Sequence, residues 1–410
     1  MKILTLNSGS NSLKFEIVVT EPNHGAAESQ VTFGSSLISG SYDNIGKPNS
    51  LFSLLQDKVA RSQEQIEIHD HGHAAELLLD WIDKGCAREK GVRSLADIQR
   101  VGHRVVHGAD RFDRPVRISD EVIRQVEELR DLAPLHNASA LKVIQATRTR
   151  PGFSALMVAV FDTVFHRTLP ERTALYPLPL ELSKRLGIRR YGFHGISHRY
   201  MMIRYAQITG RPLQKMKLIT LHLEGGSSLA AIQDGVSVDT SMGFTPLEGL
   251  MMGTRCGDID AAIVSYLMRK EHMNPSEVEE FLNKKCGLAG VSGKSADTRE
   301  LVLQLDNPAV NLALDMFSFR VTKYIGAYLA ALGGAEAIVL GGGIGENTPL
   351  VRERIFKNLE WLGASLDPVL NRRTIDAEGC VSQAGSRVEI WVIPTQENLM
   401  IAKDVVDYAE

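Results

Sequence analysis

The sequence has little cysteine and no long hydrophobic run. Its four cysteines, Cys86, Cys256, Cys286 and Cys380, are widely separated and form no C-x-x-C pair. A structural zinc site is therefore not expected, and the thiols are predicted to be reduced. No segment approaches the roughly 20 apolar residues that a membrane-spanning helix needs, and the opening MKILTLNSGS is too poor in apolar residues for a signal-peptide core. We therefore expect a cytoplasmic protein that does not enter a membrane.

The sequence also lacks a strong charge of either sign. Lysine and arginine total 46 and aspartate and glutamate 49, so the net charge is −3 with neutral histidine. This weakly acidic balance argues against nucleic acid as the main partner. A chain of 410 residues is longer than one hydrophobic core usually supports, so two domains are expected.

Short apolar runs alternate with helical patterns along the chain. Residues 3–6 and 13–19 are predicted to be strands on either side of a polar turn, NSGSNS. Residues 20–50, rich in Gly, Ser and Asn, are expected to form a loop or a weak hairpin. The later segments are predicted to be helices at 121–133, 138–150 and 316–332, strands at 155–162 and 337–340, and a strand, turn and helix within 387–409. The alternation predicts an α/β fold.

Two segments of the sequence are similar to each other. TLNSGSNSLKFEI begins at Thr5 and TLHLEGGSSLAAI at Thr220, and both place Gly and Ser between two strand-like halves. The second copy continues through Asp234-Gly235, a hairpin signal, into another strand. A repeat at this distance indicates two related domains rather than a solenoid.

A third glycine-rich segment, GGGIGENTP, follows the predicted strand 337–340. Asn347 or Thr348 is a candidate cap for the next helix, Pro349 suits its first turn, and Gly363 is predicted to end it. A glycine loop that opens a helix offers backbone N–H groups to a phosphate. None of the three glycine segments matches a P-loop or a G-x-G-x-x-G fingerprint.

Several polar residues stand in apolar or glycine-rich surroundings: Arg104, His136, Asp162, His194 and Arg255. An arginine binds carboxylate or phosphate through a fork of donors, so two arginines would suit an acid substrate and a phosphoryl group. Taken singly, each of these residues also has an ordinary explanation as a salt bridge, a helix cap or a buried imidazole. His194 and His198 are four residues apart, which on a helix would also permit a metal pair.

Nine motifs occur in an order that resembles the acetate kinase family of short-chain carboxylate kinases. They are LNSGSNSLKF, GHRVVHG, APLHN, VFDTVFH, YGFHGISH, VDTSMGFTPLEGLMMGTRCGD, GKSADTR, GGGIGEN and VIPTQEN. The resemblance runs nearly from end to end, and SMGFTPLEGLMMGTR is its most specific part. It implies the duplicated α/β domain shared by sugar kinases, actin and heat-shock chaperone ATPases, which agrees with the repeat.

The resemblance also implies roles for individual residues. Catalytic roles fall on Arg104, His136, Asp162, His194 and Arg255. The substrate pocket would use Arg104, Val106, Leu135, Phe193 and Pro246. Nucleotide contacts would come from Lys14, His222, Leu223, Glu224, Gly225, Gly226, Asp297, Thr298, Arg299, Gly343, Ile344, Gly345, Glu346 and Asn347. Asn7 and Glu397 resemble the residues that hold Mg²⁺ or Mn²⁺, directly or through water, and ATP or ADP is the implied co-substrate.

The implied reaction is direct in-line transfer from ATP to acetate. Arg104 would hold the carboxylate, while Arg255 and His194 would neutralise the moving phosphoryl group. Acetate is ionised at neutral pH, so Asp162 is expected to orient Arg104 rather than act as a base. His194 is expected to reach a phosphoryl oxygen rather than a metal, with His198 as a structural neighbour.

The main departure from the family pattern is in HLEGGSS. Glu224 and Gly225 stand where the family usually has Gly-Asn. A carboxylate beside a triphosphate is repulsive unless it points away, binds metal or pairs with a cation. A phosphoryl donor other than ATP, such as pyrophosphate, is therefore an alternative. Propionate and butyrate are alternative acceptors. A non-catalytic nucleotide-binding protein is the remaining alternative.

The expected organisation is two lobes. The first covers residues 1–164 and is completed by the helix at 396–410, and the second, residues 165–395, would bind nucleotide and form a homodimer. The dimer is implied by the resemblance alone.

Overall fold

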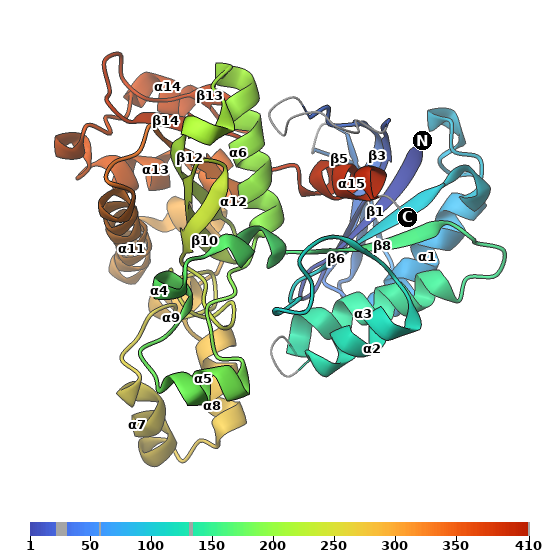
Figure 1. Ribbon diagram of the computed structural model, residues 1–410, viewed down its shortest axis with the longest axis horizontal. Coiled ribbons are helices and arrows are strands. Elements are labelled where there is room, and N and C mark those ends of the chain that lie inside the picture. The colour runs from blue at the N-terminus through green and yellow to red at the C-terminus, as the bar shows by residue number, and fades with distance from the viewer. Residues whose placement is uncertain (22–30, 57–58, 131–133, 409–410) are drawn as a thin grey trace. The chain divides into compact units, whose positions relative to one another are not determined.

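A computed structural model describes residues 1–21, 31–56, 59–130 and 134–408. The chain divides into two compact units, Met1–Val164 with Gln396–Glu410, and Phe165–Thr395. Each unit is built around its own sheet (Figure 1). None of the helices in the described ranges has the length and apolar character needed to cross a membrane.

The first unit contains a mixed sheet in the order β5-β4-β3-β2-β1-β6-β8-β7. Its strands are β1 Lys2–Ser8, β2 Leu13–Val19, β3 Ser35–Asp43, β4 Leu51–Gln56, β5 Val59–Gln65, β6 Arg100–Val105, β7 Val116–Arg117 and β8 Leu156–Phe161. β1 and β2 form the predicted antiparallel hairpin, closed by a bond from the Gly9 amide to the Ser12 carbonyl at 2.8 Å. β1, β6 and β8 are parallel, so their carboxyl ends lie at one edge of the sheet.

Helices cover both faces of this sheet. They are α1 His71–Asp83, α2 Asp120–Glu128, α3 Pro134–Arg148 and α15 Glu397–Asp407. α3 packs on α1, β1 and β6, while α15 lies across β1, β6 and β8 (Figure 1). Gly102 permits this approach, because a Cβ there would lie 2.6 Å from the side chain of Ile401 and 2.7 Å from that of Val405.

Of the two expectations for residues 20–50, a loop is wrong for Ser35–Asp43, which form the long strand β3 and pair antiparallel with β2 and β4, as in a hairpin. Residues 22–30 of that segment lie outside the described part of the structure. The Gly and Ser content that suggested a loop has a packing cause. A Cβ at Gly40 would lie 2.6 Å from the ring of Phe15, so glycine makes room for an aromatic side chain on the neighbouring strand.

The second unit has a sheet in the order β11-β10-β9-β12-β14-β13. Its strands are β9 Lys217–Leu223, β10 Ser227–Gln233, β11 Val236–Thr240, β12 Ala337–Gly341, β13 Gly379–Cys380 and β14 Glu389–Val392. β9, β12 and β14 are parallel, and β9, β10 and β11 form an antiparallel meander. Asp234 and Gly235 both have positive φ, 54° and 85°, as the predicted tight hairpin requires.

The helices of the second unit are α4 Glu171–Ala174, α5 Leu180–Leu186, α6 Gly195–Thr209, α7 Ala262–Lys270, α8 Pro275–Lys284, α9 Gly287–Ser292, α10 Thr298–Leu301, α11 Pro308–Leu332, α12 Gly342–Asn347, α13 Pro349–Phe356 and α14 Pro368–Arg373. α11 contacts α9, α13, β9 and β10, and its apolar residues join the main core of the unit. α6 packs against β9 and β12 (Figure 1). The helix predicted after Pro349 ends at Phe356 rather than at Gly363, and a short 3-10 turn, Glu360–Leu362, precedes that glycine.

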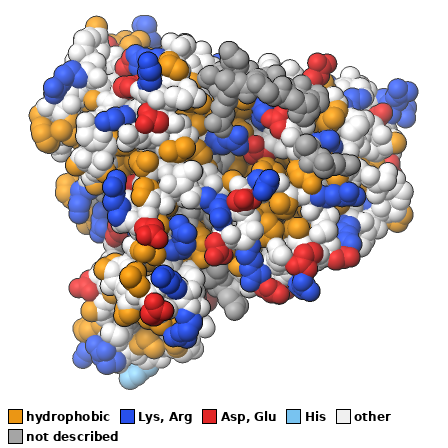
Figure 2. Space-filling model, viewed as in Figure 1, with side chains coloured by type: hydrophobic (Ala, Val, Ile, Leu, Met, Phe, Trp, Pro, Cys, Tyr) orange, Lys and Arg blue, Asp and Glu red, His pale blue; other side chains and the backbone are white. Residues whose placement is uncertain are grey.

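α7 is unusual because none of its residues is buried. Its apolar side chains Ile263, Val264 and Tyr266 are 40%, 36% and 54% exposed. Hydrophobic side chains are visible on the part of the second unit formed by α5, α7 and α8 (Figure 2).

Candidate functional site

In the first unit, four of the predicted residues meet at the carboxyl edge of the parallel strands. Asn7 is near the end of β1, Arg104 is on β6, and Asp162 directly follows β8. Glu397 is the first residue of α15, which crosses the same strands. These residues are far apart in sequence, and the parallel pairing of β1, β6 and β8 is what brings them together.

Asp162 accepts hydrogen bonds from Arg104 with both of its carboxylate oxygens. The Arg104 Nε donates to Oδ1 at 2.8 Å, and Nη2 donates to Oδ2 at 2.6 Å. Asp162 is fully buried, while the Arg104 side chain is 12% exposed. A buried forked pair of this kind fixes the plane of the guanidinium as well as its position.

Asn7 links this pair to Glu397. The Arg104 Nη1 donates to the Asn7 Oδ1 at 2.8 Å, and the Asn7 Nδ2 donates to the Glu397 Oε2 at 2.6 Å. The Glu397 Oε2 also lies 3.9 Å from the Arg104 Nη1. The cluster therefore contains one guanidinium, two carboxylates and one amide, linked through Arg104 and Asn7.

The remaining candidates of the first unit are less fully placed. Lys14 is exposed on β2 directly opposite Asn7 in the hairpin register. Val106 is buried just after β6. Leu135 and His136 belong to α3, but their side chains lie outside the described part of the structure.

In the second unit, His194, His222 and Arg255 gather around Gly226. His194 precedes α6 with a left-handed φ of 57°, and its ring lies 4.3 Å from that of His222 at the end of β9. A Cβ at Gly226 would lie 3.4 Å from both the Arg255 Nη1 and the His194 Nε2. The absence of a side chain at Gly226 thus lets an imidazole and a guanidinium approach the same turn.

Ser228 joins His194 to His198. Its hydroxyl lies 2.9 Å from the His194 Nδ1 and 2.8 Å from the His198 Nε2, and the other ring nitrogen of His198 contacts the Thr220 hydroxyl at 2.8 Å. His198 is fully buried, and burial holds its pKa well below the usual range. This geometry makes His198 a buried support for His194. The described residues also contain no cluster of three or more His, Cys, Asp or Glu side chains that could hold a metal ion.

Arg255 is positioned by few contacts of its own. Its Nη1 donates to the Pro246 carbonyl at 3.2 Å and lies 3.7 Å from the Met252 sulfur. Burial lowers the pKa of its guanidinium. No carboxylate within the described ranges forms an ion pair with Arg255, so its environment suits a bound anion.

Glu224 lies beside a side chain that can carry positive charge. Its Oε2 lies 3.5 Å from the His222 Nε2, and its side chain is 46% exposed. The Glu224 amide donates to the Gly226 carbonyl at 3.2 Å, which makes the turn between β9 and β10 tight. This carboxylate was expected to point away from the phosphates, to bind a metal or to pair with a cation. In the structure it pairs with His222, a side chain that can carry positive charge.

The predicted nucleotide segments of the second unit lie together. β12 pairs with β9 so that Gly341 is opposite His222, and a Cβ at Gly342 would lie 2.6 Å from the Leu223 carbonyl. A Cβ at Gly343 would lie 3.9 Å from the Glu224 side chain, and the Gly253 amide donates to the Gly225 carbonyl at 3.1 Å. These backbone contacts place two glycine turns side by side, with Ile344 and Gly345 buried in α12.

Several side chains in these segments are already engaged within the protein. The buried Glu346 Oε1 accepts bonds from the Gly342 amide at 2.8 Å and the Thr395 amide at 2.9 Å. The Asn347 Oδ1 accepts from the Asp376 amide at 2.8 Å. Asp297 caps α10 and is paired with Arg299, while Thr298 is buried. Phe193 is also buried, and its carbonyl lies 3.0 Å from the His166 Nε2.

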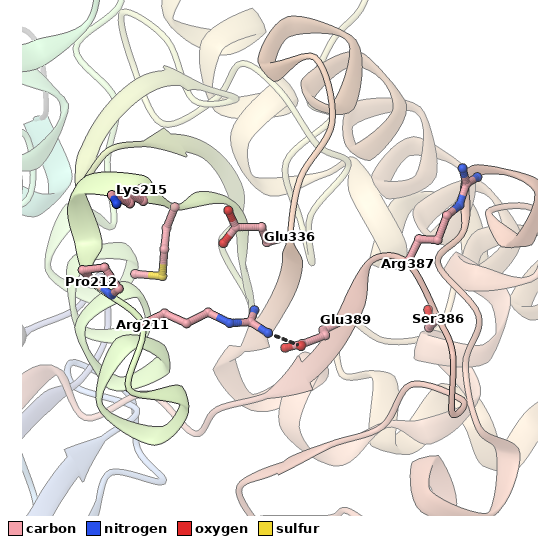
Figure 3. A pocket seen from close by; sticks show the side chains of 8 residues that line it. Arg211, Pro212, Lys215, Glu336, Ser386, Arg387 and Glu389 are labelled. Atoms are coloured by element: carbon pink, nitrogen blue, oxygen red, sulfur yellow. Dashed lines mark hydrogen bonds and ion pairs between the residues drawn. The ribbon is translucent and has the colours of Figure 1, made fainter.

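A groove of about 350 Å³ lies at the other edge of the second sheet, away from these residues. It is lined by Arg211, Pro212, Lys215, Met216, Glu336, Ser386, Arg387 and Glu389 (Figure 3). Arg211 is turned toward Glu389, and the two form an ion pair of 2.7 Å. Its lining residues precede or begin β9, β12 and β14, whereas the candidate segments 222–226 and 343–347 lie at or beyond the carboxyl ends of β9 and β12. No sequence motif pointed to these groove residues. Ser228 was also not predicted as a site residue, and its only signal in the sequence is its place in the HLEGGSS motif.

Comparisons with known proteins agree over nearly the whole chain. Residues 2–403 match the model of the acetokinase family. An acetate kinase of Chloroherpeton thalassium is 42% identical, over 98% of this chain and 98% of its own. The solved structure of Porphyromonas gingivalis acetate kinase is 39% identical, with a TM-score of 0.85 and 98% of each chain covered. That of a Francisella tularensis propionate kinase is 35% identical, also with a TM-score of 0.85 and 98% coverage of each chain. These likenesses confirm the predicted α/β fold class.

Proposed function

Because the chain belongs to the acetokinase family, we propose that it is an acetate kinase, which transfers a phosphoryl group reversibly from ATP to acetate and forms acetyl phosphate and ADP. The observation that carries this proposal is the end-to-end match to proteins of that name. The chemistry of the two residue clusters agrees with it. In one cluster Asp162 holds Arg104 in place, and in the other the partly buried Arg255 lies beside His194. A carboxylate is a weak nucleophile, so such an enzyme works mainly by positioning and charge neutralisation.

In the proposed mechanism, Arg104 binds the acetate carboxylate and Asp162 orients Arg104. The forked contact between them supports the orienting role, because both Asp162 oxygens are engaged by the guanidinium. A general base is unnecessary for a nucleophile that is already ionised. Val106, Leu135, Phe193 and Pro246 are proposed to surround the methyl group, and His136 to assist near the acceptor.

His194 and Arg255 are proposed to stabilise the phosphoryl group during transfer. Charge develops on its equatorial oxygens, and fixed donors aimed at those oxygens lower the barrier. The convergence of the two side chains at Gly226 supports this assignment. His222 and the glycine turns at Leu223–Gly226 and Gly343–Asn347 are proposed to contact the nucleotide, together with Lys14 and Asp297–Arg299.

Asn7 and Glu397 are proposed to hold Mg²⁺ or Mn²⁺. Magnesium is usually bound by one or two carboxylates together with substrate phosphates, rather than by a cage of protein ligands. A single carboxylate with a neighbouring amide fits that mode of binding. When bound, the ion supplies further positive charge for the phosphate oxygens.

Two alternatives concern the substrates. Glu224 places a carboxylate in a turn proposed to contact the triphosphate, which keeps a different donor such as pyrophosphate open. One methylene in an apolar pocket is worth only about 1–3 kcal/mol, so activity with propionate or butyrate is expected to overlap. The likeness to a propionate kinase is in line with that overlap.

We also propose that the protein is a homodimer of the cytoplasm. The exposed apolar residues of α7 support an interface on the second unit. The four cysteines are free thiols, which is typical of a reducing compartment.

A hydroxamate assay of acyl phosphate tests the proposed function. Acetate, propionate and butyrate are each combined with ATP, GTP and pyrophosphate, and ADP release is followed in parallel. The proposal expects the highest kcat/KM for acetate with ATP. Nucleotide binding without any acid-dependent ADP formation would instead identify a non-catalytic nucleotide-binding protein.

A further inference from the structure

Asp258 closes the loop that carries Arg255. Its backbone amide donates to the Gly249 carbonyl at 2.9 Å, and its Oδ1 accepts from the Gly249 amide at 2.8 Å. The two ends of the loop are therefore joined by a backbone bond and a side-chain bond. Arg255 lies within the closed segment, three residues before Asp258.

The closed loop has little freedom to adopt another shape. Gly249 and Gly257 have φ values of 105° and 68°, a region that side-chain-bearing residues rarely adopt. A Cβ at Gly257 would lie 2.2 Å from the Leu250 carbonyl oxygen. Inside the loop, the Met252 amide donates to the Arg255 carbonyl at 3.1 Å. The Gly249–Asp258 closure thus fixes the two ends of the loop. Beside Arg255, the Cys256 amide donates to the Leu282 carbonyl at 3.1 Å and the Thr254 carbonyl accepts from the Cys286 amide at 3.0 Å, so the closure acts together with contacts to α8 and the start of α9.

The closure is in turn fixed to α11. The Tyr324 hydroxyl donates to the Asp258 Oδ2 at 2.6 Å, and the Arg320 Nη1 donates to the Asp258 carbonyl at 3.1 Å. Burial, together with the nearby Asp258 carboxylate, raises the pKa of Tyr324. α11 is the longest helix within the described ranges, and its buried side chains belong to the core of the second unit. Asp258 therefore connects a loop without regular structure to a rigid element.

The Arg255 side chain has few other restraints. Its hydrogen bonds go to the Pro246 carbonyl and the Met252 sulfur, at 3.2 and 3.7 Å. Among the residues that the structure describes, no carboxylate orients Arg255 in the way that Asp162 orients Arg104. The position of its guanidinium must then follow from the position of the loop backbone.

We propose that Asp258 is a positioning residue for Arg255: by bonding Gly249 and Tyr324 at once, it sets where the Arg255 guanidinium stands during phosphoryl transfer. This inference rests on the proposed function. A misplacement of a catalytic group by about 1 Å can cost on the order of 100-fold in rate. An effect on kcat is therefore expected even though Asp258 touches no substrate.

The experiment compares Asp258→Ala, Asp258→Asn and Tyr324→Phe with the wild type in the hydroxamate assay. Asp258→Ala is expected to lower kcat about 10- to 100-fold while the KM for ATP changes less than about 3-fold. Asp258→Asn keeps an oxygen for the Gly249 amide and should retain more activity than Asp258→Ala. Tyr324→Phe leaves the loop closure but removes its link to α11, so a smaller loss of kcat is expected. Asp260→Ala is the matched control, because the Asp260 carboxylate is exposed and accepts a hydrogen bond from the nearby Ala262 amide.

The same change in an Arg255→Ala background separates positioning from a general structural role. If Asp258 acts through Arg255, Asp258→Ala should change kcat less than about 2-fold in that background. Equal losses in both backgrounds, or a normal kcat in the single variant, would overturn the inference. If Asp258→Ala does not fold, Asp258→Asn and Tyr324→Phe carry the same comparison. A wild-type protein that makes no acyl phosphate would refute the proposed function instead, so the two failures are distinct.

Discussion

The carboxylate of Asp162 holds the guanidinium of Arg104 through both of its oxygens, at 2.8 Å from Nε and 2.6 Å from Nη2. Asp162 has no exposed surface. A carboxylate engaged in this way is a poor candidate for proton transfer and a good one for fixing the plane of an arginine.

Asp162→Asn should weaken acetate use more than ATP use. The amide offers one acceptor oxygen where the carboxylate offers two, so one of the charged hydrogen bonds to Arg104 is lost. Such bonds contribute about 1.5–3 kcal/mol, and we expect kcat/KM for acetate to fall roughly 10- to 100-fold with the KM for ATP nearly unchanged. The control is Asp120→Asn, which alters an exposed pair with Arg148. If the rate of the wild type changes with pH between about pH 6 and 8 and Asp162→Asn abolishes that change, Asp162 is instead a general base.

Arg255→Ala should slow the chemical step without unfolding the protein. Removal of one preorganised donor from a developing charge typically costs about 100- to 1,000-fold in kcat. Arg255→Lys keeps the charge but not the fork, and it should fall between the wild type and Arg255→Ala. Arg372→Ala, at an exposed position of α14, is the control. Circular dichroism checks the fold, and near-normal turnover in Arg255→Ala would remove Arg255 from the mechanism.

Glu224→Asn should improve the use of ATP. The change removes a negative charge from the turn proposed to contact the triphosphate, and it leaves the backbone bonds of that turn in place. We expect the KM for ATP to fall about 3- to 10-fold, with a smaller change for Glu224→Gln, whose longer side chain fills the same space. Steady-state kinetics with ATP and with pyrophosphate measure the effect, and Glu353→Gln, an exposed change on α13, is the control. An unchanged preference between donors would show that the carboxylate points away from the bound phosphates.

The sequence predicts those parts of the fold in which local signals and packing agree. NSGSNS between two apolar runs predicts the β1–β2 hairpin, and Asp234-Gly235 predicts the β10–β11 turn. β3 was missed because Gly40 reads as a loop residue, whereas in the fold it makes room for Phe15. The need for a glycine at this position arises only when β2 and β3 are paired, so the local sequence pattern does not reveal it.

The candidate site divides in the same way. The resemblance identified Arg104, Asp162, His194 and Arg255, and the structure shows which of them are in contact. The resemblance could not identify the residues that hold these side chains in place. Ser228 bridges two imidazoles and Asp258 closes a loop, and both depend on contacts with residues distant in sequence. A serine in a glycine turn and an aspartate after a glycine have many possible roles until the backbone is placed.

Charges on α7 should change the oligomeric state. Ile263 and Tyr266 are 40% and 54% exposed on a helix without any buried residue. If α7 lies in a dimer interface, Ile263→Asp with Tyr266→Asp buries unpaired charges and should shift the mass toward the 45.1 kDa of one chain. Light scattering coupled to size exclusion measures this mass. Lys90→Asp introduces an acid on the first unit and should leave the mass unchanged. A double variant with the mass of the wild type would place any interface elsewhere.

His103 should make the protein less stable as the pH falls. Burial lowers its pKa to about 3, and neither ring nitrogen has a hydrogen-bond partner among the described residues. Below its usual pKa of 6.5 the unfolded chain takes up a proton that the folded protein cannot, so stability is lost as the pH falls from about 6.5 toward 3. At pH 5 the loss from this one residue is about 2 kcal/mol. Burial shifts the pKa of His166 and His198 in the same direction, so part of the effect persists without His103.

His103→Leu tests this assignment, because leucine has a similar volume and cannot titrate. The variant should be at least as stable as the wild type at pH 7, since it also removes an unsatisfied buried polar group. Between pH 7 and 5 it should lose about 2 kcal/mol less stability than the wild type, measured from the urea midpoints at the two pH values. His69→Leu, at an exposed position, should leave the pH dependence unaltered. If His103→Leu and the wild type lose the same stability over this range, the acid sensitivity arises from other groups.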